Sequence, residues 1–340
     1  MGEVTTVGLD IAKSVFQVHG IGAGGEILVQ RKLTRSRLLP FFEKLPACLV
    51  GIEACATAHH WARELKALGH EVRLMPPSYV KPYVKRQKND MADAAAICEA
   101  VTRPTMRFVE VKSPEQQGVM VLHRTWQTLI RQRTQLSNVI RGHMAEFGIV
   151  APVGREGLQG LIDKLADDER VPVAARSCLL MLAEQLRLVN SQVLEADRAI
   201  MAAVRSSETA RRLMGIPGVG PLLASALVAA VPDPHAFRSG RNLAAWIGLV
   251  PRQNSSGGKE RLGAITKTGD RYLRQMLVVG AMAVIRYAER NGSRRPWLVQ
   301  LMSRRTTKVA AVALANKTAR MVWAVMSSGQ PYREPVPQAA

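Results

Sequence analysis

Four carboxylates occupy positions where acids could do chemistry. Asp10 and Glu53 each follow directly on an apolar run that predicts a buried strand. Asp90 and Asp93 stand three residues apart in a segment that predicts a helix, so they share one helical face. Two like charges on one face destabilise a helix unless a cation or a base bridges them, although a first helical turn also tolerates acids.

Acids arranged in this way suit a divalent metal ion that acts on phosphate. Two-metal phosphoryl transfer needs several oxygen ligands that hold the ions roughly 3.5 to 4 Å apart. Mg²⁺ prefers carboxylate and water oxygens and binds substrate phosphates directly. We therefore predict a Mg²⁺ site formed by Asp10, Glu53, Asp90 and Asp93. Taken singly, Asp10 is better explained as an ordinary turn residue, and Glu53 has the alternative of capping the helix that follows. Asp90 and Asp93 are equally acids of a first helical turn.

The composition favours a polyanionic partner, DNA or RNA. The 340 residues include 47 Lys and Arg against 27 Asp and Glu, a formal net charge of +20. A basic ribosome-associated protein, or a merely soluble one, would share this composition. The chain shows no leader pattern and no run of about 18 apolar residues, so we expect a cytoplasmic protein with no membrane partner. Widely spaced cysteines without a CxxC pair predict core thiols in a reducing compartment; they are Cys48, Cys55, Cys98 and Cys178.

Residues 4–112 alternate between strand-like and helix-like patterns, with glycines marking the early turns. The order βββαβαβα is that of a ribonuclease H-like fold, an α/β layer structure. Strands are predicted at 4–9, 15–19, 26–30, 47–52, 71–75 and 107–111, and helices at 36–44, 59–68 and 91–102.

Two heptad patterns follow, and they predict an antiparallel coiled coil or a dimerising arm. The first places Arg133 and His143 in polar core positions, and no acid occurs between Glu115 and Glu146. Its arginines, among them Arg124 and Arg131, therefore favour a nucleic-acid contact over an ordinary solvated face. The first heptad is Leu122, Trp126, Leu129, Leu136, Ile140 and Phe147; the second is Leu179, Leu182, Leu186, Val189, Val193, Ala196 and Ile200.

From about Thr209 the chain is mainly helical and very basic. Between Arg238 and Arg320 there are seventeen Lys or Arg against three acids, which predicts phosphate contacts with a steep salt dependence. The block that contains Gly218 and Gly220 matches a helix-hairpin-helix pattern, in which glycines let the backbone approach a phosphate. A plain loop between two helices is the alternative.

The segment 251–261 is predicted to be a flexible loop with two hydroxyls, Ser255 and Ser256. Its cations would stabilise a transferring phosphoryl group; they are Arg252, Lys259 and Arg261. From the residues alone, this loop is better suited to contact phosphate than to supply a nucleophile, because an unassisted serine attacks weakly.

Together these segments resemble the DEDD transposases of bacterial insertion sequences, in the IS1111 branch of the IS110 family. The resemblance covers nearly the whole chain. It implies a RuvC-like domain at 1–112, a coiled-coil arm at 113–205 and a mainly helical C-terminal transposase domain at 206–340. The matching segments are LDIAK around Asp10, IEA around Glu53, KNDMADA at 88–94, GIPGVG at 215–220 and LVPRQNSSGG at 249–258.

The resemblance also implies a chemistry that spacing does not give. Ser256 becomes the nucleophile that forms a phosphoserine link to a DNA 5′ end, with Ser255 as the alternative one position away. The four acids become the metal ligands. A noncoding bridge RNA would pair with donor and target DNA, and the active assembly would be a tetramer of two dimers. One subunit's RuvC-like domain would then share an active centre with another subunit's serine.

We therefore expect a Mg²⁺-dependent DNA transposase and recombinase. One alternative is a RuvC-like junction nuclease that uses water, which would leave no covalent protein–DNA adduct. The other is a noncatalytic nucleic-acid-binding protein, which would bind tightly without transferring strands.

Overall fold

The computed structural model of the chain divides into two compact units, Met1–Pro114 and Glu115–Ala340. It describes residues 2–85, 89–165, 167–291 and 296–334. Lys88 of the predicted acidic segment therefore lies outside the described residues. The three-part division at residues 112 and 205 stays a prediction.

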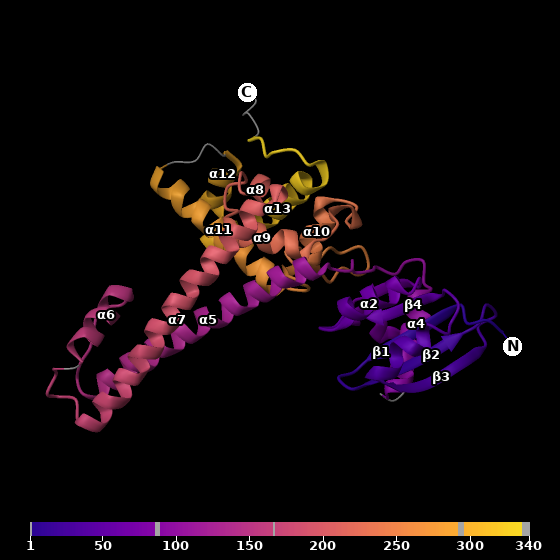
Figure 1. Ribbon diagram of the computed structural model, residues 1–340. Helices are drawn as coiled ribbons and strands as arrows, with labels where there is room; N and C mark the ends of the chain where they lie inside the picture. Colours follow the sequence, from indigo (N-terminus) through magenta and orange to yellow (C-terminus); the bar gives the residue numbers. More distant parts are fainter. Residues whose placement is uncertain (1, 86–88, 166, 292–295, 335–340) are drawn as a thin grey trace. The chain divides into compact units, whose positions relative to one another are not determined.

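The first unit is built on a mixed five-stranded sheet (Figure 1). Three strands pair as successive antiparallel neighbours, and two more extend the sheet in parallel from the first strand, in the order β3-β2-β1-β4-β5. This confirms the mixed α/β layer structure predicted from the sequence. The strands are β1 (Thr6–Ile11), β2 (Val15–Ile21), β3 (Ile27–Thr34), β4 (Leu49–Glu53) and β5 (Glu71–Met75).

Alternation along the strands gives the sheet two differently covered faces. One face buries Val7 and Leu9 of β1 and Val50 and Ile52 of β4 in an apolar cluster shared with α1 and α2. The other face carries glycines and polar residues at the intervening positions and is covered by α4. The helices of this unit are η1 (Arg35–Arg37), α1 (Leu38–Phe42), α2 (Ala58–Ala67), α3 (Pro77–Val80), η2 (Lys81–Tyr83) and α4 (Asp90–Val101).

Helix α4 approaches the sheet closely because two strand residues that face it are glycines. A Cβ atom at Gly8 would lie 2.1 Å from the Ala94 carbonyl oxygen and 2.4 Å from the Cys98 amide nitrogen. A Cβ atom at Gly51 would lie 2.8 Å from Val101 Cβ. Any side chain at Gly8 would therefore push the helix backbone away from β1.

The strand predicted at 107–111 is wrong in extent. Only Val109 pairs with the sheet, through an antiparallel bridge in which its amide donates to the Leu74 carbonyl at 2.8 Å. Further along, the Lys112 amide donates to His59 Nδ1 of α2 at 3.2 Å. This contact holds the segment against α2, so the chain leaves the edge of the sheet after the single pair between Val109 and Leu74.

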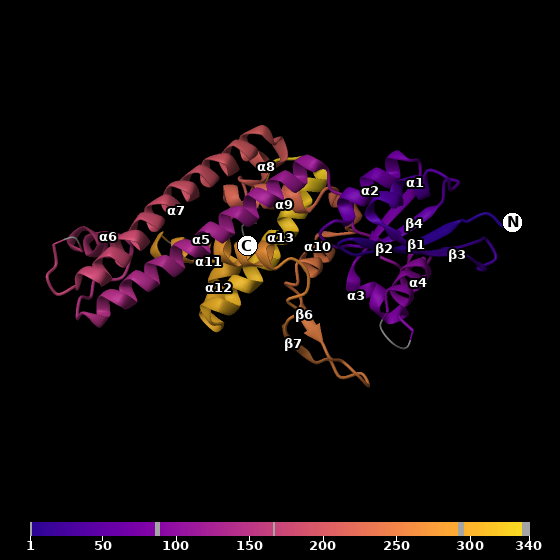
Figure 2. The same cartoon turned by 60° about the horizontal axis from the view of Figure 1, so that its bottom comes forward.

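Two long helices, α5 (Pro114–Glu146) and α7 (Val173–Ser206), run antiparallel and side by side (Figures 1 and 2). The Trp126 indole of α5 donates to Asp197 Oδ1 of α7 at 2.8 Å. The predicted pair of long helices is therefore present, while coiled-coil winding stays a prediction.

The heptad on α7 is confirmed better than the heptad on α5. Every predicted α7 position is buried except Leu182, which is half-buried. On α5, His143 is exposed, so its predicted core position is wrong, and the neighbouring Met144 is buried instead. Met144 belongs to an apolar cluster with residues of α6 (Arg155–Lys164), and this added helix decides which side of α5 is covered.

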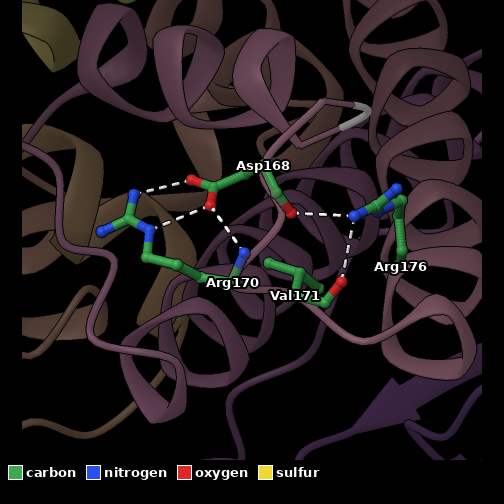
Figure 3. Close-up of polar contacts among 4 residues, drawn as sticks. All are labelled: Asp168, Arg170, Val171 and Arg176. Atoms are coloured by element: carbon green, nitrogen blue, oxygen red, sulfur yellow. Dashed lines mark hydrogen bonds and ion pairs between the residues drawn. The ribbon is translucent and has the colours of Figure 1, made fainter.

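Backbone carbonyls near the start of α7 are held by arginine (Figure 3). Arg176 Nη2 donates to the carbonyls of Asp168 at 2.9 Å and Val171 at 3.1 Å. Arg170 adds two charge-assisted bonds to the Asp168 carboxylate, at 2.9 and 2.6 Å. The hydrogen bond from Arg170 lowers the pKa of Asp168.

The rest of the second unit is a helical body with α13 (Thr307–Ser328) at its centre. Ala310, Ala315 and Ala319 are fully buried, so α13 packs closely against α10 and α11. Among the described residues, α13 alone is long and apolar enough to cross a membrane, and 44% of its apolar window is buried inside the protein. The other elements are α8 (Glu208–Leu213), α9 (Pro221–Ala230), η3 (Pro234–Ala236), α10 (Gly240–Trp246), β6 (Pro251–Gln253), β7 (Leu262–Ile265), α11 (Arg271–Asn291) and α12 (Pro296–Arg304).

The prediction that all four cysteines fill the core is half right. Cys48 and Cys98 are buried, and burial raises the pKa of each thiol to about 11. Cys55 and Cys178 are exposed, because one follows the end of β4 and the other lies on the outer side of α7. All four are free thiols.

A buried histidine joins α5 to two helices of the body. His123 is 1% exposed, with Nε2 2.8 Å from Ser225 Oγ and Nδ1 2.9 Å from the Tyr272 hydroxyl. Because the Ser225 hydroxyl donates to the Pro221 carbonyl at 3.0 Å, the imidazole donates through Nε2 and accepts from Tyr272 at Nδ1. Burial lowers the pKa of His123 to about 4, which keeps it neutral.

The neutral state of His123 makes stability fall in acid. Its folded pKa lies below the ordinary value of 6.5, so the unfolded chain takes up the proton first as the pH falls. The contribution of neutral His123 to the free energy of unfolding is complete above pH 6.5. It decreases by about 1.4 kcal/mol per pH unit as the pH falls toward 4. We expect His123→Gln to be less stable at pH 7 and to lose less stability between pH 7 and pH 5 than the unchanged chain, as measured by urea unfolding.

The pKa of His59 is also lowered to about 4, chiefly by burial. His59 is present in both the unchanged chain and His123→Gln, so its contribution to the pH dependence of stability cancels when the two are compared. An equal loss of unfolding free energy in both proteins would contradict the assigned state of His123.

Candidate functional site

Asp10 and Glu53 lie at the same edge and on the same face of the sheet. Strands β1 and β4 pair in parallel with Leu9 opposite Ile52, so Asp10 and Glu53 are the next residues along neighbouring strands. Alternation puts both side chains on the face that α4 covers, and both are half-buried. The strand β1 continues to Ile11, so Asp10 lies just inside the strand end rather than after it.

Asp90 and Asp93 occupy the first turn of α4. The helix runs antiparallel to β1, because Cys98 Sγ donates to the Thr6 carbonyl while Ala94 lies against Gly8. Its first turn therefore lies toward the strand end that carries Asp10. Asp93 is half-buried and Asp90 is exposed.

The cap of α4 explains how two acids are accommodated there. The Asn89 side chain accepts a hydrogen bond from the Ala92 amide at 2.8 Å, which fixes the helix start. Acids in the first turn also interact favourably with the helix dipole. This ordinary role accounts for both aspartates locally, and it is compatible with a metal role.

Asp10, Glu53 and the first turn of α4 do not form a closed ligand set. In the part of the chain that the structure describes, no three His, Cys, Asp or Glu side chains lie close enough to hold a metal ion. The donor set consists of carboxylate oxygens, the ligand chemistry that suits Mg²⁺. The fold thus brings Asp10 and Glu53 together and directs the start of α4 toward them.

Two buried polar residues on the same face were missed from the sequence. Gln17 is the direct cross-strand neighbour of Asp10, and His19 is that of Gly8. Gln30 Nε2 donates to His19 Nδ1 at 3.3 Å, and burial together with the charge of Lys85 lowers the pKa of His19. The sequence did contain a sign of them: Gln17 and His19 are two positions apart in an otherwise apolar strand, so both point to the same face of the sheet.

Ser256 lies at the tip of a β-hairpin. The segment predicted as a loop therefore contains the short strand β6 and a cross-strand pair at its tip, while its flexibility stays a prediction. Strands β6 and β7 are antiparallel, and the hairpin extends away from the neighbouring helices of its unit (Figure 2). Ser256 and Lys259 pair across the tip, with the Lys259 amide donating to the Ser256 carbonyl at 3.1 Å. Between them Gly257 and Gly258 have φ of 55° and 74°, the left-handed conformations that a two-residue hairpin turn requires.

The two serines of the hairpin differ in their hydrogen bonds. Ser255 Oγ accepts from the Arg261 amide at 3.2 Å, which ties its hydroxyl into the hairpin. Ser256 is exposed, and no hydrogen bond to its hydroxyl occurs within the described residues. Ser256 is thus the more available of the two hydroxyls.

Exposed cations lie on the serine hairpin, and others lie on α5. Arg252, Lys259 and Arg261 are exposed on the hairpin, and Arg124 and Arg131 are exposed on α5. All five are placed where they can meet phosphate. Another arginine of α5 is used differently: Arg141 donates to the carbonyls of Ala151 at 3.1 Å and Gly154 at 2.7 Å.

Gly218 and Gly220 lie in the loop between α8 and α9. Gly218 has a φ of 89°, and a Cβ atom there would lie 2.9 Å from the Gly280 carbonyl oxygen of α11. The close contact with α11 therefore explains the glycine at position 218, independently of any contact with phosphate. Gly220 caps α9, and a Cβ atom there would meet nothing within 4 Å, so its surface is open. DNA binding by this loop stays a prediction.

Comparison with known proteins places these features in one family. A family model for DEDD transposases of IS110 type matches residues 7–149, and a model described as "Transposase IS116/IS110/IS902 family" matches residues 210–295. A putative transposase, y4pF/y4sB, of Sinorhizobium fredii is 46% identical over 99% of this chain and 88% of its own length. The chain belongs to the IS110/IS116 family of DEDD transposases.

Two further relatives agree with this assignment. A probable family 20 transposase of Pseudomonas aeruginosa is 47% identical over 97% of this chain and 99% of its own length. The transposase for insertion sequence element IS1111A of Coxiella burnetii is 38% identical over 98% and 92%. Membership implies an insertion-sequence enzyme that cleaves and recombines DNA, and its DEDD domain suggests a divalent metal requirement.

The glycine contact beneath α4 gives a direct test of this site. We expect Gly8→Ala to lower the free energy of unfolding by about 1–3 kcal/mol or more, since its Cβ would overlap the helix backbone. DNA cleavage should fall with it, because the first turn of α4 moves relative to Asp10. Denaturant unfolding and a cleavage assay measure the two effects.

Gly142→Ala is the matched control, because a Cβ atom at this position of α5 meets nothing within 4 Å. It should be neutral or stabilising by up to about 1 kcal/mol. Unchanged stability and cleavage in Gly8→Ala would show that α4 does not lie this close to β1.

Proposed function

We propose that this transposase exchanges DNA strands through a phosphoserine intermediate at Ser256. Divalent metal, taken to be Mg²⁺, would be bound by the acids of the first unit, and a noncoding bridge RNA would select donor and target DNA. The observation that carries the serine step is the hairpin: its turn presents an exposed Ser256 hydroxyl among Arg252, Lys259 and Arg261.

The proposed reaction conserves the number of phosphoester bonds. Ser256 Oγ forms a bond to the scissile phosphorus, and the bond from phosphorus to the DNA 3′ oxygen breaks. The serine proton is transferred, in net, to the departing 3′ oxygen, which leaves a 3′ hydroxyl and a 5′ phosphate bound to serine. Reversal of these steps on a second DNA end joins the strands.

The cations of the hairpin suit this transfer. Charge accumulates on the phosphate oxygens in the transition state, and fixed positive groups nearby stabilise that charge. The hairpin turn holds Lys259 opposite Ser256 in the strand pairing, so this lysine stays near the reacting group. Arg261 is connected to the same tip through its backbone contact with Ser255.

The proposed metal ligands are Asp10, Glu53, Asp90 and Asp93. A bound divalent ion would supply Lewis-acid stabilisation of phosphate oxygens. The sheet fixes Asp10 and Glu53, and the Asn89 cap fixes the start of α4. Gln17, directly opposite Asp10, has an amide that can donate to that carboxylate and hold its orientation.

RNA and DNA binding are supported by the distribution of charge. The net charge is +20, and no acid lies between Glu115 and Glu146 on α5. Exposed Arg124 and Arg131 on that helix would contact phosphate, and Gly220 at the start of α9 offers open backbone. Base pairing by the RNA would then select sequence, with the protein contacting the backbone.

The proposed dimers and tetramer are supported by the outer side of α7. Met181 and Leu188 lie seven residues apart on one side of that helix and are 61% and 57% exposed, an apolar pair that a second copy could cover. A homo-oligomer would let the serine of one subunit act with the acids of another. The cytoplasmic location belongs to the same proposal.

A junction nuclease that uses water is the second candidate, since the sheet-edge acids would suffice for it. It would cleave DNA with Mg²⁺ and without help from Ser256.

We expect Ser256→Ala to abolish strand exchange and the covalent protein–DNA adduct while it leaves DNA and RNA affinity unchanged. The reason is that no other hydroxyl of the hairpin is equally available, as Ser255 Oγ accepts from the Arg261 amide. Denaturing gels with end-labelled DNA measure the adduct, and filter binding measures affinity.

Ser255→Ala is the matched control and should keep the adduct. Adduct formation by Ser256→Ala but not by Ser255→Ala would move the nucleophile by one position. Full cleavage by Ser256→Ala without any adduct would support the water-using nuclease instead.

A further inference from the structure

A groove of about 790 Å³ opens beside the base of the serine hairpin. Residues of β6 and β7 form one side, α13 forms the other, and Trp297 of α12 contributes from a third direction. All of these elements belong to the second unit. The serine chemistry proposed above does not use this groove.

The floor of the groove is apolar and partly open. Trp297 is 37% exposed and Val309 is 51% exposed, and Ile265 and Val312 continue the same surface. An exposed indole at the edge of a groove offers a flat surface on which another ring can stack.

The rim of the groove is positively charged. Lys308, Lys317 and Arg320 line it and are exposed, and none of its lining residues is acidic. Lys317 Nζ lies 4.6 Å from the centre of the Trp297 ring, so one cation is already held against the indole. An aromatic surface bordered by three cations complements a base with phosphates on either side.

A polar group within the groove could add contacts to base edges. Asn316 Nδ2 donates to the Leu249 carbonyl at 3.1 Å, which fixes the amide. Its Oδ1 is an acceptor of the kind that meets N–H groups of bases.

We propose that this groove binds an unpaired stretch of DNA strand, with one base against Trp297 and neighbouring phosphates on Lys308, Lys317 and Arg320. The unpaired state is required because the face of a base is open to the Trp297 ring only when that base is unstacked from its neighbours. The ligand class is single-stranded DNA without sequence preference.

The groove lies on the path of the strand that Ser256 would hold, an argument that rests on the proposed function. Ser256 at the tip comes five positions after Pro251 at the groove, about 16 Å along a strand at 3.3 Å per residue. At the duplex rise of 3.4 Å this length corresponds to about five nucleotides, and an unstacked strand spans it with fewer. DNA bound in the groove would thus be continuous with DNA joined to Ser256.

The test uses the full chain and a single-stranded DNA that carries 5-iodouracil, which crosslinks to aromatic side chains on irradiation. We expect a crosslink at Trp297, located by mass spectrometry, and none from the matching duplex. Trp297→Leu should remove this crosslink and weaken binding at least about 10-fold, as expected for the loss of a stacked base. Tyr287→Leu, at another exposed aromatic residue of the same unit, should keep both.

A charge variant covers the case in which Trp297→Leu fails to fold. Lys308→Gln combined with Arg320→Gln should lower the slope of log affinity against log salt by about 1.4, since two phosphate contacts are lost. Lys164→Gln on α6, outside the groove, should leave the slope unchanged.

The outcomes separate this proposal from the serine mechanism. Ser256→Ala should crosslink at Trp297 as the unchanged chain does. If the unchanged chain forms this crosslink but no covalent adduct with DNA, the serine step alone is overturned. Crosslinks elsewhere with unchanged affinity in Trp297→Leu would overturn the groove assignment. More efficient crosslinking of Trp297 to RNA of the same sequence would also overturn the groove assignment. A change in the oligomeric state of Trp297→Leu without a change in its DNA affinity would overturn it as well.

Discussion

The contact between α4 and β1 at Gly8 is the constraint on which the first unit depends. The absence of a side chain there lets the helix backbone reach the strand, and Gly51 allows the same on β4. Because α4 runs antiparallel to β1, this contact directs the acids at the helix start toward Asp10 and Glu53. A carboxylate that must bind metal needs a rigid support, and here the support is a helix placed directly on a sheet.

The second unit solves a different problem, the presentation of a hydroxyl to a large substrate. Two glycines with positive φ close the hairpin in two residues and leave Ser256 at its tip, beside cations and away from other protein hydrogen bonds. The body behind it is held by small buried residues of α13 and by neutral His123, which fastens α5 to α9 and α11. In the proposed account, rigid packing thus supports an exposed reactive group.

Much of this arrangement could be predicted from the sequence, because local patterns determine it. Alternation and turn residues gave the strands in order, and the heptad on α7 gave its buried side. The sequence could not show that Gly8 is a packing contact, since that depends on Ala94 arriving from a distant segment. The hairpin at Ser256 was missed although the Gly-Gly pair is a known turn signal, because its polar strands lack apolar alternation. His143 was placed in a core because the pattern could not reveal how α6 packs.

The central claim is that divalent metal binds beside β1, β4 and the start of α4. It can be tested most directly by replacing Mg²⁺ with Fe²⁺ in the full chain and generating hydroxyl radicals at the bound metal, which cut nearby backbone. The account predicts cuts at three segments, next to Asp10, Glu53 and Asp93, and their joint loss in Asp93→Asn. Cuts confined to one segment, or a pattern unchanged in Asp93→Asn, would contradict it.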